Sequence, residues 1–162
     1  MNESNVIPFP HRIDTRLDSI DRSSELVDIC DMTLAVRGFY LEPDDVTTLL
    51  GVAPTTLHRR GDRRGLGLPD HSEGAWVLRM TGTTPVGPDD LLDALLRRVP
   101  PPDSSVWGLL RAEYEVTLVL TVFLSSPSSG FSISSSRLRR IGQLVPKFEF
   151  ELFPCDEAYE RM

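Results

Sequence analysis

Alternating apolar and polar residues predict five β-strands along this chain of 162 residues. The alternation is clearest near the C-terminus, where Phe148 and Phe150 take one face and Glu149 and Glu151 take the other. A strand centred on residue 120 is partly apolar on both faces, which is typical of a strand near the middle of a sheet. The expected strands span residues 34–40, 75–80, 116–124, 131–133 and 147–153.

The outward positions of these strands carry charged side chains at Arg37, Arg79, Glu149 and Glu151. Side chains on one face of neighbouring strands lie close enough to interact. We therefore expect all four residues on one polar sheet face, with at least one Arg–Glu pair across neighbouring strands.

Apolar residues at helical spacing predict four helices. Two of them begin at a proline followed by two aspartates, at Pro43 and Pro88, which suits a helix N-terminus. The expected helices cover residues 43–50, 88–99 and 137–145, and one more follows the capping residues 103–105 and leads into Glu115. With a hairpin around Pro127, this order indicates an α+β fold, in which helices pack on one face of a mainly antiparallel five-stranded sheet. The strand order stays open.

The length and a hydrophobic content of 40% suit one compact domain. We expect a polar N-terminal arm over residues 1–26, a single α+β domain over 27–153 and an acidic C-terminal tail over 154–162. Within the arm, Ile13, Leu17 and Ile20 would line one side of a short helix, so both a docked helix and a disordered arm remain open.

The net charge of −7 argues against general nucleic-acid binding and against membrane-surface binding, because both favour positively charged proteins. The only cysteines, Cys30 and Cys155, lie far apart without a CxxC motif, so neither a disulfide framework nor a zinc module is expected. No stretch resembles a membrane span or a signal peptide, and we expect a cytoplasmic protein without a cofactor.

An arginine-rich segment, residues 58–65, carries four arginines and one aspartate inside a long predicted loop over residues 53–74. Guanidinium groups bind phosphate and carboxylate in a bidentate manner, although the segment lacks the spacing of a P-loop. Alternatively, this is a solvated loop whose arginines neutralise the acidic helix starts at residues 44–45 and 89–90. The candidate ligand- or partner-binding residues are His58, Arg59, Arg60, Asp62, Arg63, Arg64, His71 and Trp76. For Trp76, a role as core anchor is the competing interpretation.

The sequence offers no convincing catalytic or metal site. His58, Asp62, His71 and Glu73 lack a diagnostic ligand spacing. The serine-rich stretches contain no GxSxG motif. The carboxylates beside Cys30 disfavour its thiolate form.

Several segments resemble the bacterial family known as domain of unknown function 4279. The resemblance covers about residues 26–153 and implies a small intracellular α+β domain of unassigned activity, so no catalytic residue is carried over. The segments that carry it are Pro43-Asp44-Asp45-Val46-Thr47, Leu50-Gly51-Val52-Ala53-Pro54-Thr55, Gly61-Asp62 and Gly74-Ala75-Trp76-Val77-Leu78.

Together these observations favour a non-enzymatic binding or regulatory domain that acts by protein–protein contact, in its most concrete form an immunity-type or adaptor protein. The alternative is a small enzyme or sensor that binds a phosphorylated ligand through residues 58–65. A concave pocket beside the arginines and Trp76 would favour the ligand, and a protruding loop would favour a protein partner. The oligomeric state stays open.

Overall fold

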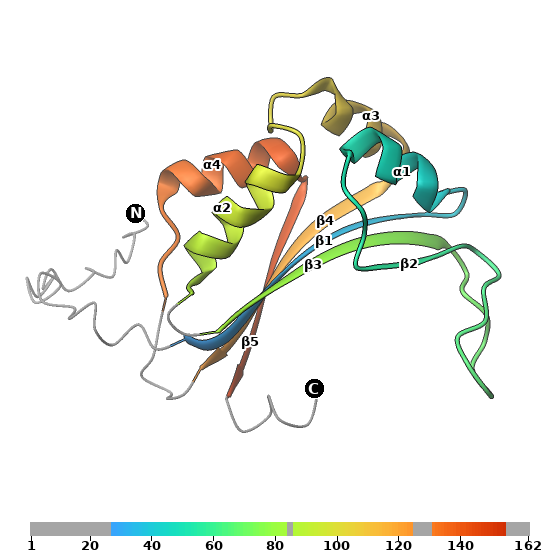
Figure 1. Ribbon diagram of the computed structural model, residues 1–162, viewed down its shortest axis with the longest axis horizontal. Coiled ribbons are helices and arrows are strands. Elements are labelled where there is room, and N and C mark those ends of the chain that lie inside the picture. Colours follow the sequence, from blue (N-terminus) through green and yellow to red (C-terminus); the bar gives the residue numbers. More distant parts are fainter. Residues whose placement is uncertain (1–26, 84–85, 125–130, 155–162) are drawn as a thin grey trace, which may run out of the picture.

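The computed structural model describes residues 27–83, 86–124 and 131–154, which form a curved sheet with four helices on one side (Figure 1). The strands are β1 (Val27–Gly38), β2 (Thr56–His58), β3 (Gly74–Thr83), β4 (Glu115–Leu124) and β5 (Lys147–Pro154). The helices are α1 (Pro43–Leu50), α2 (Pro88–Arg98), α3 (Ser105–Glu113) and α4 (Ser135–Leu144).

The sheet has the strand order β2-β3-β1-β4-β5, with β1 at its centre. The pairs β2–β3, β3–β1 and β1–β4 are antiparallel, and only β4–β5 is parallel. The predicted α+β class and the mainly antiparallel five-stranded sheet are therefore confirmed.

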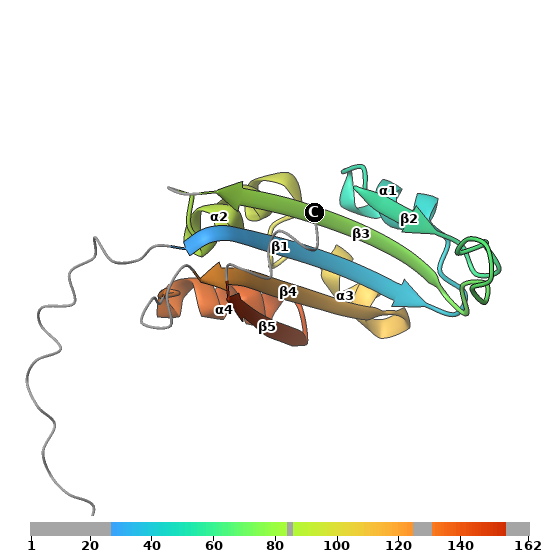
Figure 2. The ribbon, with the colours of Figure 1, turned by 90° about the horizontal axis from the view of Figure 1, so that it is seen from below.

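The core lies between the sheet and the helices. In register, Val36 of β1 lies opposite Trp76 of β3 and Val116 of β4, and all three are fully buried. Helix α2 covers this face with Leu92 and Leu95. Figure 2 shows the opposite face of the sheet, on which no helix of the described chain lies.

Two expectations about the strands are wrong. Residues 131–133 form no strand, and the segment leads from Phe131, whose ring lies 6.1 Å from that of Phe150, into α4. The fifth strand is β2 instead, a three-residue edge strand that is too short for an alternation pattern to reveal it. The hairpin expected around Pro127, between β4 and a strand at 131–133, is wrong because residues 131–133 form no strand. Because α4 carries the chain back across the sheet, the next strand, β5, pairs with β4 in parallel. Residues 125–130 lie outside the described residues.

The polar sheet face is confirmed, since the registers place Arg37, Arg79, Glu149 and Glu151 on the face opposite the helices. The expected Arg–Glu pair is wrong within the described part of the chain, because Arg79 pairs with Asp31 instead. Asp31 belongs to β1, which begins seven residues earlier than its alternation suggested. The acidic side chains that interrupt the apolar pattern there obscured this part of the strand.

The expected N-terminal arm lies outside the described residues, as does the tail from residue 155. None of the helices that the structure describes is long and apolar enough to cross a membrane.

Candidate functional site

The arginine loop, defined here as residues 58–73, joins β2 to β3 and extends from the end of the sheet (Figure 1). Two backbone hydrogen bonds close its neck. The N–H of Gly61 donates to the carbonyl of His71 at 2.8 Å, and the N–H of His71 donates to the carbonyl of Asp62 at 2.9 Å. The Asp62 carboxylate also accepts the backbone N–H of Arg59 at 2.6 Å. The neck therefore gives the loop a fixed base, from which residues 63–70 project.

Two histidines stack at this neck. The ring centroids of His58 and His71 lie 3.5 Å apart, and Arg64 Nε donates to His71 Nδ1 at 3.3 Å. Burial, together with His71 and the Arg64 guanidinium, lowers the pKa of His58 below its usual value of 6.5. The stack thus favours a neutral His58 at neutral pH.

Arg59 is held against the start of α1. Its Nε donates to Glu42 Oε2 at 3.2 Å, and a terminal nitrogen pairs with the Asp44 carboxylate. The hydrogen bond to Glu42, aided by Asp44, raises the pKa of Arg59. The loop thus neutralises one acidic helix start, as the solvated-loop interpretation expected.

The acidic start of α2 is neutralised by α4 and not by the arginine loop. The expectation that the loop arginines neutralise residues 89–90 is therefore wrong. Arg137 of α4 lies 2.9 Å from Asp89 and 2.7 Å from Asp93 of α2.

Arg60 lies over the ring of Phe39, with its guanidinium carbon 3.4 Å from the ring centroid. Phe39 in turn makes an edge-to-face contact with Tyr40, and both aromatic side chains are exposed. An arginine stacked on an aromatic face is held in place while its edges stay free for further hydrogen bonds. Arg63 makes no ion pair or side-chain hydrogen bond to another described residue.

The four arginines therefore do not converge on one point. Arg59 faces Glu42 and Asp44, Arg60 faces Phe39, and Arg64 faces His71. A phosphate site requires several donors directed at the same oxygens. The arrangement is instead a set of arginines spread over a protruding surface.

Trp76 is not part of that surface. It is fully buried, and its indole N–H donates to the hydroxyl of Thr47 on α1 at 3.0 Å. Among the eight predicted site residues, Trp76 thus has the position of a core anchor. The other seven all lie in the arginine loop.

The apolar tip of the loop was not predicted from the sequence. Leu66 is fully exposed and lies between Gly65 and Gly67, which both have positive φ angles, and Leu68, which follows Gly67, is 61% exposed. Their only signal in the sequence is a pair of leucines among glycines and a proline, where no helix or strand could bury them. Phe39 and Tyr40 were likewise missed, because they were read as the end of a strand.

No group of three or more possible metal-ligating side chains is found in the ranges that the structure describes. The histidines and carboxylates weighed as a metal site therefore do not come together there as a ligand set.

A family model described as "Domain of unknown function (DUF4279)" matches residues 28–153, most of the chain and nearly the whole segment on which the resemblance was based. No curated protein and no solved structure matches the sequence.

Proposed function

The chain belongs to the DUF4279 family of domains of unknown function, and we propose that this domain acts by binding another protein rather than by catalysis. The binding surface is the arginine loop together with the neighbouring aromatic pair Phe39 and Tyr40. Within this proposal, the most concrete role is that of an adaptor or immunity-type protein in the cytoplasm.

One observation carries the proposal: an exposed apolar tip projects from a cationic loop on a fixed neck. Leu66 and Leu68 lie fully or largely in solvent, although burying a leucine side chain is worth about 1.5 to 3 kcal/mol. At the base of the loop, Arg60 stacks on Phe39 next to Tyr40, and tyrosine and arginine are among the residue types that most often dominate binding energy at interfaces. The loop thus offers apolar anchors at its tip and arginine and aromatic side chains at its base.

The charge of this surface indicates the kind of partner. The arginine loop carries four arginines against Asp62, Asp70 and Glu73, a formal charge of +1 that is concentrated in residues 58–65, in a chain whose net charge is −7. An acidic partner surface with apolar pockets complements this loop, and long-range attraction between the two would speed their association.

The alternative, a phosphorylated small ligand, has less support from the geometry. Arg59 and Arg64 already hold partners within the chain, and Trp76 is too deeply buried to line a pocket beside them. An anion could meet Arg63 and the free edge of Arg60, but no concave wall that includes Trp76 would surround it.

Calorimetric titration separates the two classes. The wild-type chain is titrated at low salt with a panel of nucleotides and sugar phosphates, next to a variant carrying Arg60→Ala and Arg63→Ala. The proposal predicts no binding heat at millimolar concentration for either protein. Heat in the wild type that disappears in the double variant would overturn protein recognition in favour of a phosphorylated ligand.

A further inference from the structure

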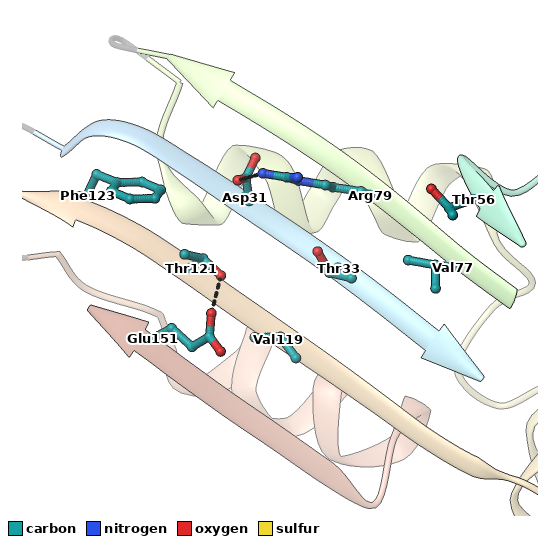
Figure 3. A pocket seen from close by; sticks show the side chains of 9 residues that line it. All are labelled: Asp31, Thr33, Thr56, Val77, Arg79, Val119, Thr121, Phe123 and Glu151. Atoms are coloured by element: carbon teal, nitrogen blue, oxygen red, sulfur yellow. Dashed lines mark hydrogen bonds and ion pairs between the residues drawn. The ribbon is translucent and has the colours of Figure 1, made fainter. Parts of the chain in front are cut away.

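A groove runs across the uncovered face of the sheet, away from the arginine loop (Figure 3). Its volume is about 550 Å³, within the range of small-molecule sites. Every strand contributes to its lining. The polar residues used below are Asp31 and Thr33 of β1, Arg79 of β3, Thr121 of β4 and Glu151 of β5.

One side of the groove holds a fixed arginine. The side chain of Asp31 is only 4% exposed, and its carboxylate accepts hydrogen bonds from Arg79 and, at 2.5 Å, from the hydroxyl of Thr81. The Arg79 side chain remains 59% exposed. Because a guanidinium carries five N–H donors, anchoring one edge on Asp31 leaves others directed at the groove. Because Asp31 already orders the Arg79 side chain in the free protein, ligand binding loses less conformational entropy there.

The other side of the groove holds a carboxylate. Glu151 accepts the hydroxyl of Thr121 at 3.0 Å and is otherwise exposed (Figure 3). The charged lining residues are Asp31, Arg79 and Glu151, which give the groove a formal charge of −1. That charge disfavours a phosphate dianion. It favours a ligand that brings one anionic group to Arg79 and one cationic group to Glu151.

The separation of these groups limits the length of the ligand. Arg79 reaches Asp31 and Glu151 reaches Thr121, and these two anchor residues are register partners on the neighbouring strands β1 and β4. Strand spacings of about 4.8 Å therefore put the two charged groups roughly 5 to 10 Å apart. An extended peptide advances by about 3.5 Å per residue, so two or three residues span this distance.

We propose that this groove binds a short zwitterionic peptide of two or three residues. Arg79 receives its terminal carboxylate and Glu151 its terminal ammonium group. The hydroxyls of Thr33 and Thr121 meet its peptide groups, and Val119 offers a surface for small apolar side chains. The groove and the arginine loop are different surfaces, so this inference does not depend on the proposed function.

The test is a calorimetric titration of the full chain at low salt with trialanine, its N-acetylated form and its C-terminal amide. Trialanine should bind, and each blocked form should bind at least about tenfold more weakly, because each lacks one charged end. Absence of heat up to about 10 mM trialanine would overturn the proposal. Equal binding of either blocked form would also overturn it, because recognition would then not require both termini.

Two variants locate the site. Glu151→Gln lies on the exposed edge strand and should leave the fold intact while abolishing the preference for trialanine over its acetylated form. Arg79→Lys keeps a cation beside Asp31 but loses the planar fork, so trialanine should bind at least about tenfold more weakly. The controls are Glu149→Gln and Arg37→Lys, on the same face but outside the lining, and both should bind as the wild type does. Unchanged binding in both test variants, or equal losses in the controls, would overturn the assignment.

Discussion

Gly74 and Gly108 differ in what a side chain would meet at each position. A β-carbon on Gly74 would clash with the backbone carbonyl of Leu41, whereas one on Gly108, inside α3, would meet no atom within 4 Å apart from its chain neighbours and the helix's own backbone. We predict that Gly74→Ala destabilises the domain by at least about 2 kcal/mol, because the backbone must shift. Gly108→Ala should stabilise it by about 0.5 to 1 kcal/mol through helix propensity. Urea unfolding measures both, and equal effects would contradict the packing described around Leu41.

Cys30 is another residue whose behaviour follows from its surroundings. Burial, with Asp31 and Asp90 adding smaller effects, raises the pKa of its thiol to about 11. A thiol this far above neutrality is almost entirely protonated and therefore unreactive. In a Cys155→Ser background, Cys30 should resist a thiol reagent at pH 8 in the native protein and react readily in urea. Rapid labelling of the native protein would show that this part of β1 is open to solvent.

The neck of the arginine loop gives a prediction at the level of an element. Since the pKa of His58 is lowered in the folded loop, the open loop binds the proton more readily than the closed one. The closed neck should therefore be most stable above pH 6.5 and lose stability as the pH falls through the lowered value. In an NMR titration, His58 should titrate below 6.5, and the amides of Gly61 and His71 should lose protection from exchange on acidification.

The matched variant for this prediction is His58→Phe, which keeps an aromatic ring against His71 but removes the titrating group. Its loop should show a weaker pH dependence of amide protection. A pKa for His58 at or above 6.5, or identical pH dependence in both proteins, would rule out the stacking of a neutral His58 on His71 as the contact that holds the neck.

The elements that the sequence predicted well are those whose pattern spans several residues. Helices α1 and α2 are predicted by a proline, two aspartates and an apolar face that contains leucines, and β5 is predicted by its strict alternation. Strand β2 could not be predicted, because three residues at a sheet edge carry no period and are held only by pairing with β3. Strand β5 runs parallel to β4 because α4 connects the two strands as a crossover. The sequence suggested a hairpin around Pro127 after β4, so this crossover was not predicted.

The candidate site was predictable in its arginines but not in its arrangement. Four arginines within six residues stand out in an acidic chain, yet nothing in the sequence shows that Arg60 stacks on Phe39 or that Arg59 reaches back to Glu42. Those contacts depend on tertiary folding between segments about 20 residues apart. Leu66 and Leu68 were not predicted for a different reason. Periodic patterns of apolar residues arise where side chains are buried, and these two leucines are exposed.

At the scale of the whole molecule, the composition of residues 1–24 predicts a minor role for this arm in stability. It offers few apolar side chains against an ordering cost of about 1 to 2 kcal/mol per residue. Deleting it should leave the melting temperature nearly unchanged. A loss of more than a few degrees would indicate instead that Ile13, Leu17 and Ile20 dock on the domain.

The charge distribution of the molecule places a cationic segment, residues 58–65, in a chain with a net charge of −7. Binding through that loop should weaken as salt rises, because the attraction to an acidic partner is screened. The apolar tip should contribute a component that salt does not weaken. Substitutions at Leu66 and Leu68 therefore measure the apolar contribution to binding, and changes in ionic strength measure the electrostatic contribution.

The most direct test of protein recognition is quantitative capture from a lysate of the native host, with the full chain as bait. Three baits are compared: the wild type, a loop variant carrying Leu66→Ser and Leu68→Ser, and a control with Leu109→Ser, a leucine on α3 that is about as exposed as Leu68. We predict an acidic protein that the wild type and the control enrich alike. The loop variant should enrich it at least about tenfold less, the equivalent of about 1.4 kcal/mol. Equal enrichment by all three baits would contradict the assignment of the arginine loop as the binding surface.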